Sequence, residues 1–271
     1  MIELEYLSAD GCPLFAFSTE SLDGIAAAHR PVLVLMHGGG PDHRSLVPLA
    51  RLLADSAVVI LPDVRGYGKS RCSDPRCHTW HQYAQDVVSL LDHVHVRQAV
   101  IGGAGLGSTI GLRTAVTYPE RIAGLVLISV EDIEDDEAKA AEIAFMDAFA
   151  QRVRTRGVEA AWQPILPDLS PIVGTMVREA MNSADPASLA AAAAIGHDRS
   201  FRSIDELLVV EAPTLLFAGA DWRHPAALAR SLAQSLPRAR LGDASMSDEL
   251  QTTEDFAGAF APEIRAFVGE L

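Results

Sequence analysis

Four stretches of this chain consist almost entirely of apolar residues, at positions 31–36, 57–61, 99–103 and 124–129. A continuous apolar run of this length is typical of a strand that is buried on both faces of a parallel sheet. The segments between them have helical spacing, at 45–54, 80–94 and 107–118. Strands that alternate with helices in this way imply right-handed crossover units and a sheet covered by helices on both faces.

The pattern changes after the fourth strand. Residues 131–142 are strongly acidic, and helical segments continue to about residue 205 without a clear strand. We interpret the acidic run at 131–137 as a solvated helix start. Strand character returns at 213–219, followed by a helix at 225–234, a short last strand at 239–242 and a closing amphipathic helix at 256–271. We therefore expect an α/β core domain, residues 1–130 and 209–271, with a helical cap insertion at 131–208.

Composition limits the partners of this protein. The chain has 271 residues, of which 49% are hydrophobic, and its formal net charge is −14. This charge argues against nucleic acid or an anionic membrane as a partner, because both favour a cationic face. No signal peptide or membrane span is evident, and three cysteines do not suggest a disulfide framework. We expect a cytoplasmic protein that acts on a small molecule; the oligomeric state stays open.

The segment 99–107 reads Ala-Val-Ile-Gly-Gly-Ala-Gly-Leu-Gly. An apolar strand that enters a tight turn and then a helix has the layout of a nucleophile elbow, in which a serine normally fills the central position. Here Gly103 and Gly107 frame Gly105, which has no side chain that could attack a substrate.

Three further motifs occur in a fixed order along the chain. They are His37-Gly-Gly-Gly-Pro41, Asp63-Val-Arg-Gly-Tyr-Gly-Lys-Ser70, and Pro213-Thr-Leu-Leu-Phe-Ala-Gly-Ala-Asp221 with Pro225 four residues later. With these motifs the chain resembles the α/β-hydrolase fold family over nearly its whole length, most closely its esterase, lactonase, prolyl-aminopeptidase and haloperoxidase-like branch. The resemblance implies a mostly parallel central sheet with helices on both faces and a helical cap.

The resemblance also implies positions for a catalytic triad of serine, acid and histidine, in that chain order. It places Gly105 at the nucleophile, Asp221 at the acid and Met246 near the base. Two of the three groups would then be missing, which argues against ordinary serine hydrolysis. His224 is either a surface histidine that opens a helix or a catalytic group. Ser108 fits packing or capping better than a role as nucleophile.

An oxyanion hole could survive these losses, because backbone amides form it. The resemblance assigns these amides to Gly39 and Leu106, beside the positive end of the following helix. It places His37, Gly38 and Trp162 around the pocket, with a structural role for His37. We expect Asp63 and Arg65 to connect their turn to residues 37–41, which we call the glycine loop, since buried charges are usually paired.

No cofactor or metal is expected. Cys72, Cys77, His78 and His81 cluster in ten residues, but their spacing matches no zinc finger or ribbon. The segment falls in a loop that varies freely in this fold.

Three functions remain open from the sequence. The first is a non-hydrolytic enzyme of the lyase, cyclase or isomerase type, which would act on a small carbonyl compound through the oxyanion hole. Asp221, without a histidine partner, would then serve as acid or base with a raised pKa. The second is a non-catalytic protein that binds a small molecule. The third is a hydrolase that uses rewired residues such as Asp221 and His224.

Overall fold

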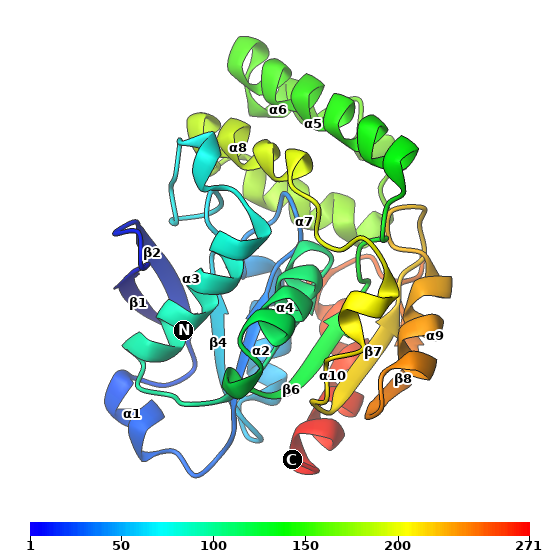
Figure 1. The fold of residues 1–271 in the computed structure, drawn as a ribbon. Helices are drawn as coiled ribbons and strands as arrows, with labels where there is room; N and C mark the ends of the chain where they lie inside the picture. The colour runs from blue at the N-terminus through cyan, green and yellow to red at the C-terminus, as the bar shows by residue number, and fades with distance from the viewer.

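The computed structural model describes residues 1–271 and contains one eight-stranded sheet in the order β1-β2-β4-β3-β5-β6-β7-β8 (Figure 1). The strands are β1 (Ile2–Leu7), β2 (Pro13–Ser18), β3 (Val32–Met36), β4 (Val58–Pro62), β5 (Ala99–Ala104), β6 (Ile122–Ile128), β7 (Thr214–Ala218) and β8 (Ala239–Ser245). All pairings from β4 to β8 are parallel. This confirms the predicted α/β architecture.

The first two strands were not predicted. β1 and β2 form an antiparallel hairpin, and β2 also pairs antiparallel with β4. In β1 the side chains alternate between solvent and core, with Leu4 and Tyr6 buried and their neighbours exposed. This alternation is the signature of an edge strand with one solvated face, and it differs from the continuous apolar runs of the central strands.

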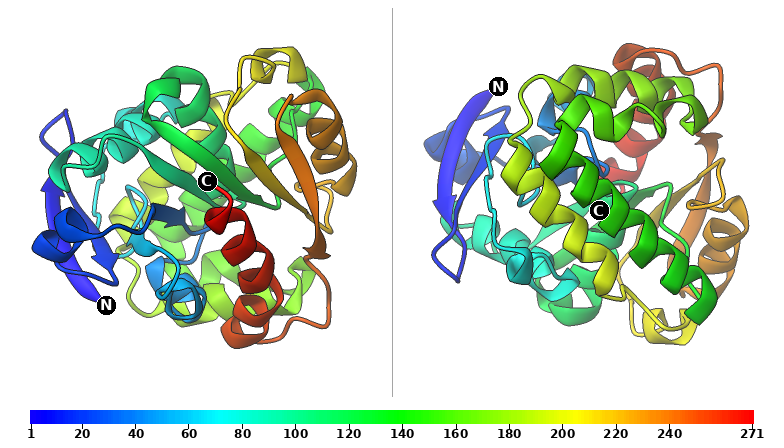
Figure 2. Two further views of the ribbon diagram at one scale, coloured as in Figure 1. Left: turned by 90° about the horizontal axis from the view of Figure 1, so that it is seen from below. Right: turned by 90° about the horizontal axis from the view of Figure 1, so that it is seen from above.

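Helices cover both faces of the sheet (Figure 2). They are α1 (Leu22–Ala27), α2 (Val47–Leu53), α3 (Trp80–His93), α4 (Leu106–Thr117), α5 (Asp136–Arg156), α6 (Val158–Trp162), α7 (Pro171–Met181), α8 (Pro186–Ala192), α9 (Ala226–Ser235) and α10 (Thr253–Gly269). Alternate residues of β3 enter different cores: Val34 joins the side of α3, α4 and α9, whereas Leu33 and Leu35 join the side of α2 and α10. No helix is long and apolar enough to cross a membrane.

Only helices and turns occur between β6 and β7, where the sequence predicts a helical segment at 131–208. These helices lie over the edge of the sheet at which β5, β6 and β7 end (Figures 1 and 2). They share a small core that includes Phe149, Val153 and Leu189. However, Ile172 of α7 and Ile195 pack into the cores beside the sheet. The division of the chain at 131 and 208 into two domains stays a prediction.

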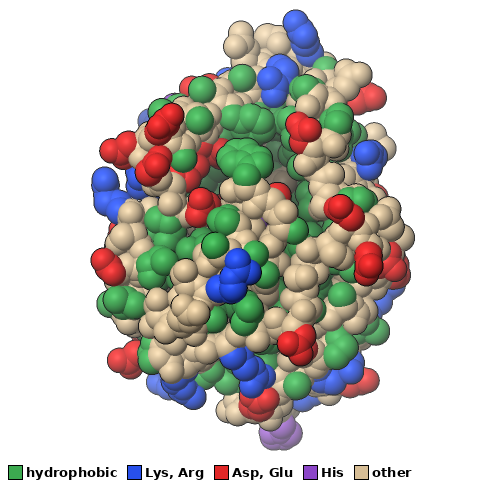
Figure 3. Space-filling view, turned by 90° about the vertical axis from the view of Figure 1, so that its right-hand side faces the viewer, with side chains coloured by type: hydrophobic (Ala, Val, Ile, Leu, Met, Phe, Trp, Pro, Cys, Tyr) green, Lys and Arg blue, Asp and Glu red, His purple; other side chains and the backbone are tan.

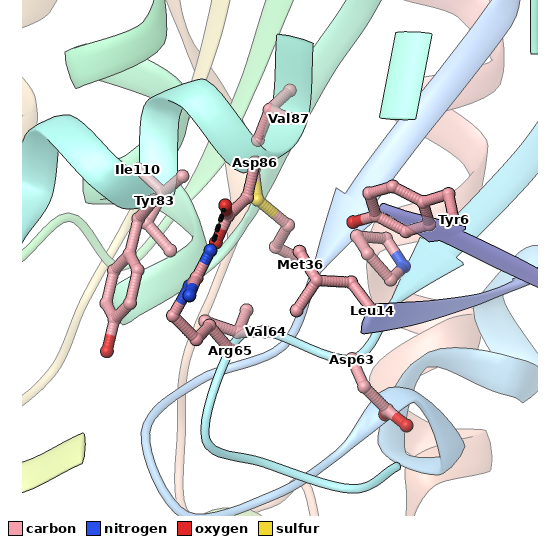
Figure 4. Close-up of a pocket in the computed structure, with 11 residues that line it drawn as sticks. Tyr6, Leu14, Met36, Asp63, Val64, Arg65, Tyr83, Asp86, Val87 and Ile110 are labelled. Atoms are coloured by element: carbon pink, nitrogen blue, oxygen red, sulfur yellow. Dashed lines mark hydrogen bonds and ion pairs between the residues drawn. The ribbon is translucent and has the colours of Figure 1, made fainter. Parts of the chain in front are cut away.

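A buried arginine joins three parts of the core. Arg65 donates to both carboxylate oxygens of Asp86 in α3, at 2.7 and 2.9 Å, and to both of Asp10 in the β1–β2 turn, at 2.8 and 3.0 Å. Figure 4 shows Arg65 and Asp86 side by side at a small cavity. The prediction that Arg65 ties its turn to the glycine loop was therefore wrong, because Arg65 connects α3 to the β1–β2 hairpin. Asp63 does reach the end of the glycine loop, where it accepts from the His43 amide at 3.0 Å.

We expect Asp86→Ala to lower the free energy of unfolding, measured by urea denaturation, by about 3–5 kcal/mol, because it leaves part of a buried cation unpaired. Asp92→Ala is the matched control on the same helix. Asp92 is 66% exposed and pairs with Arg121, so its removal should cost only about 0–1 kcal/mol. Equal losses from the two substitutions would contradict the structural role of the Arg65 network.

Candidate active site

The turn between β5 and α4 lies close to the end of β3. A Cβ atom at Gly107 would lie 2.2 Å from the Met36 carbonyl oxygen, and one at Gly103 would lie 2.0 Å from the same atom. Glycine at both positions therefore lets the start of α4 approach β3 closely. Between them, Gly105 has a φ of +53° and a ψ of −116°, a conformation that residues with a side chain adopt only under strain.

A Cβ atom at Gly105 would stand in close contact with two neighbouring residues. The nearest atoms to a Cβ at this position are Nε2 of His224, at 3.2 Å, and Cα of Gly38, at 3.9 Å. The position that resembles the nucleophile site thus faces an imidazole nitrogen on one side and the glycine loop on the other. The loop after β7 supplies this imidazole.

Asp221 orients His224 through that loop. Nδ1 of His224 lies 2.9 and 3.0 Å from the two carboxylate oxygens of Asp221. The same carboxylate accepts from the backbone amides of Arg223, at 2.9 Å, and His224, at 3.0 Å. We assign the proton on Nδ1 from this contact, which leaves the Nε2 lone pair toward Gly105. The pair has the relation of an acid and a base in a catalytic triad.

The expectation that Asp221 lacks a histidine partner was wrong. Burial alone would raise the pKa of Asp221, but hydrogen bonds and charge from His224 outweigh it and hold this pKa below its usual value. Asp221 is therefore ionised at neutral pH. Its role changes from that of an independent acid or base to that of a group which orients the imidazole and stabilises its protonated form.

Met246 directly follows β8, in the loop where the resemblance places the base. Its backbone amide donates to the Ala218 carbonyl at 3.2 Å, and its side chain packs against the core beside α2 and α10. A thioether cannot accept a proton at neutral pH. The imidazole beside Gly105 comes instead from the neighbouring loop, three residues after the acid, so the sequence argument that the base is lost does not describe this geometry.

The glycine loop and the first residue of α4 each contribute one of the two amides that the resemblance assigns to an oxyanion hole. The Gly39 amide has no acceptor within the protein. Leu106 is the first residue of α4, and its amide has no acceptor within the helix. A Cβ at Gly38 would lie 3.6 Å from the Ala104 carbonyl oxygen, so the glycine loop is close to the end of β5. The two amides assigned to an oxyanion hole are thus free to bind an oxygen; that function stays a prediction.

Backbone groups occupy both ring nitrogens of His37, so neither nitrogen is available to a substrate. Its Nδ1 lies 2.8 Å from the Gly38 carbonyl oxygen, and its Nε2 accepts from the Val64 amide at 3.0 Å. Because it is buried, its pKa is lowered, which keeps the ring neutral. Both ring nitrogens are occupied, as the structural role predicted for His37 requires.

Trp162 of α6 lies against the glycine loop. A Cβ at Gly40, whose φ is +105°, would be 2.7 Å from the indole ring. Trp162 also packs edge-to-face on Phe149, with ring centroids 4.9 Å apart. The side chain therefore belongs both to the core of the helical segment and to the surface above the loop.

Two site residues were missed by sequence reasoning. Glu131 was read as part of a solvated helix start, but it is partly buried, and the charges of His224 and Arg223 act on it. The hydroxyl of Tyr67 lies 3.9 Å from a Cβ at Gly39. The available signal for Glu131 was its place directly after the apolar run 124–129, because residues there meet at the active edge of a parallel sheet.

The remaining candidates for a nucleophile or a metal ligand make contacts that hold the fold together. The Ser108 hydroxyl lies 2.7 Å from the carbonyl oxygens of Gly103 and Ile128, so it packs α4 onto the sheet. His78 is buried, which lowers its pKa to about 4, and its ring contacts the Tyr83 hydroxyl and the Cys72 carbonyl. The group whose ligand atoms lie close enough for a metal is a different one, Asp42, His43 and Asp63. Arg44 and backbone amides already occupy its carboxylates.

We expect Gly105→Ser to create a reactive serine, because its Cβ would stand beside Nε2 of His224 and its hydroxyl within reach of that base. The variant should react with a fluorophosphonate probe, detected by mass spectrometry at residue 105. The strained backbone should cost about 1–3 kcal/mol of stability. The double variant Gly105→Ser/His224→Ala should not react; equal labelling of the two would contradict the placement of His224.

Comparison with known proteins agrees with the fold. Residues 31–247, more than half of the chain, match the alpha/beta hydrolase fold family. The chain is 30% identical over 132 residues to 3-oxoadipate enol-lactonase 2 of Acinetobacter baylyi, covering 48% of this chain and 46% of the relative. It is 32% identical over 99 residues to an uncharacterised hydrolase of Bacillus subtilis, covering 36% of each. These matches span less than half of either relative.

Solved structures match over nearly the whole chain. An enol-lactonase from Burkholderia xenovorans has a TM-score of 0.77 at 24% identity, covering 97% of this chain and 99% of its own. An esterase from Thermogutta terrifontis has the same score and identity, covering 100% and 97%. The bottromycin epimerase BotH has a TM-score of 0.73 at 24% identity and covers 100% of both chains. Because the family model matches residues 31–247, the chain belongs to the α/β hydrolase fold family.

Proposed function

We propose that this protein is a non-hydrolytic enzyme, of the lyase, isomerase or cyclase type, that transfers a proton on a small carbonyl compound. The observation that carries the proposal is the position of Nε2 of His224, 3.2 Å from a Cβ position at Gly105 that is empty. A base is oriented toward the reacting position, and no nucleophile stands in front of it. Acyl transfer through a serine is not available to this arrangement, whereas proton abstraction is.

In this proposal the neutral imidazole of His224 takes a proton from the carbon next to the substrate carbonyl. Asp221 stabilises the imidazolium that forms, as the acid of a triad does. The amides of Gly39 and Leu106 bind the carbonyl oxygen as negative charge develops on it. A donor of this kind is worth about 2.7–4 kcal/mol in a preorganised site. His224 therefore replaces Asp221 as the acid–base group.

Two further observations support this proposal. Figure 3 shows a hollow with hydrophobic side chains in the upper part of the face that forms the right-hand side of Figure 1. Such a surface suits a small organic substrate. The structural neighbour BotH is named for an epimerisation, which is not a hydrolysis, although its likeness to this chain concerns the fold. A small-molecule partner, without nucleic acid or membrane, and a cytoplasmic location stay predictions.

Hydrolysis by direct attack of water is the second candidate. The relatives are named as hydrolases, and His224 could activate a water molecule in the space where a serine would stand. Water would then replace the missing nucleophile in the attack on an ester or lactone. This candidate uses the same base and the same amides, so only the fate of the substrate separates the two.

The test compares proton exchange with hydrolysis. The protein is incubated in D2O with acetylacetone, ethyl acetoacetate, pyruvate and γ-butyrolactone, and NMR follows deuterium at the carbon beside each carbonyl, above the rate without protein. We expect exchange in at least one compound, without hydrolysis. His224→Ala should slow it by about 10²–10⁴-fold, the usual contribution of general acid–base catalysis. Asp221→Asn should slow it as well.

A second histidine–aspartate pair supplies the matched control. His197 lies 2.8 Å from Asp147 on the helical segment, and its side chain is 51% exposed. His197→Ala should leave exchange unchanged. Hydrolysis that depends on His224 and incorporates ¹⁸O from labelled water, without exchange, would support water attack instead. Binding of the carbonyl compounds with neither reaction would support a non-catalytic binding protein.

A further inference from the structure

The backbone places Glu131 beside the His224 loop. The chain leaves β6 at Ser129, which has a φ of +55° and whose amide donates to the Phe217 carbonyl at 3.1 Å. Three residues later, the Asp132 amide donates to the Arg223 carbonyl at 2.8 Å. Glu131 lies between these two anchors, so it is fixed to the end of β7 and to the loop that carries the imidazole.

The side chain of Glu131 is left without a salt bridge. Arg223 is the neighbouring cation, but its guanidinium lies 2.6 Å from Glu142 of α5. The groups that face Glu131 are His224, Arg223, Glu142, Thr109 and Tyr67. Burial raises the pKa of Glu131 above its ordinary value, and the positive neighbours do not reverse this. A partly buried carboxyl group without an ion pair is suited to hold a proton and to release it.

Tyr67 and Thr109 are two further neighbours of the Glu131 carboxyl group. The Tyr67 hydroxyl lies 3.9 Å from the position of a Cβ at Gly39, and burial raises the pKa of Tyr67. Thr109 belongs to the first turn of α4, where its amide bonds to the Gly105 carbonyl at 3.1 Å. Glu131 therefore has neighbours in the turn that carries Tyr67, in the first turn of α4 and in the loop that carries His224.

We propose that Glu131 is a second acid–base residue of this site and returns a proton to the intermediate that His224 generates. This inference rests on the proposed function. His224 removes a proton from carbon, and the C–H electron pair becomes the enolate. The carboxyl O–H of Glu131 then gives its proton to the enolate at carbon or oxygen, and the O–H electron pair stays on the carboxylate. Proton transfer from imidazolium to Glu131, directly or through water, restores the starting state.

The first test measures the protonation of Glu131 without a ligand. NMR follows the side-chain carboxyl groups of protein labelled with ¹³C-glutamate during a pH titration, and Glu131→Gln assigns the signal. We expect Glu131 to titrate above an ordinary glutamate, because burial raises its pKa. Glu137→Gln, at an exposed neighbour in the same acidic run, should leave the Glu131 titration unchanged.

Glu142→Gln is a second variant that tests the same geometry. It frees the Arg223 guanidinium to approach Glu131, so the pKa of Glu131 should fall toward or below its ordinary value. If Glu131 in the unmodified protein already titrates in the ordinary glutamate range or below it, Glu131 is a structural partner of Arg223 and the inference is overturned. A Glu142→Gln variant that leaves a raised Glu131 pKa unchanged would contradict the placement of Arg223 beside Glu131, and the inference with it.

The second test uses deuterium exchange into acetylacetone, ethyl acetoacetate, pyruvate and γ-butyrolactone. We expect Glu131→Gln to slow exchange by about 10²-fold, while Glu137→Gln has no effect. Exchange that requires His224 but is equally fast in Glu131→Gln overturns the role of Glu131 and leaves the proposed function intact. Absence of His224-dependent exchange in all four compounds overturns the proposed function, and the role of Glu131 falls with it, whatever its titration shows.

Discussion

The close approach of α4 to β3 is the constraint on which this site depends. It is possible only because Gly103 and Gly107 have no Cβ atoms, since a Cβ at either position would overlap the Met36 carbonyl group. This packing brings the first amide of α4 next to the glycine loop that follows β3. Both features involve backbone atoms, so they do not require a serine at Gly105. The elbow geometry and the nucleophile are therefore separable properties of the fold.

Three histidines show how hydrogen-bond partners decide the role of an imidazole. Backbone groups occupy both ring nitrogens of His37, and its burial lowers its pKa. His78 is likewise occupied, by a tyrosine hydroxyl and a carbonyl. In His224 only Nδ1 is engaged, by an ionised carboxylate, and Nε2 remains directed at an open position. Of these three, only His224 can accept a proton from a bound molecule without losing a structural contact.

The sequence predicted strands β3 to β7 well because each of them is buried on both faces and appears as an unbroken apolar run. It did not predict β1 and β2, whose alternating pattern gave a weaker signal at the chain terminus. Asp221 and His224 were both recognised as candidates, but their pairing was not. Chain order suggested a base after β8, whereas the tight loop after β7 folds His224 back onto Asp221. The spacing of apolar residues along the sequence gives no information about such a local turn.

Glu131 illustrates a different limit. In the sequence it heads a run of acidic residues, and most of that run is exposed at the start of α5. Whether the first member points to solvent or to the sheet depends on the left-handed residue Ser129 and on hydrogen bonds to β7 and the next loop. These are tertiary contacts, and they outweigh the local preference of an acidic stretch for water.

The contact between Trp162 and Gly40 links two parts of the protein mechanically. The indole occupies the volume that a Cβ of Gly40 would need, and Val177 of α7 borders the same volume at 3.1 Å. The helical segment therefore forms one wall of the loop that holds the Gly39 amide. A displacement of α6 and α7 away from the sheet would remove that wall and let the loop relax. Binding energy gained beneath these helices can thus be used to fix the position of the Gly39 amide.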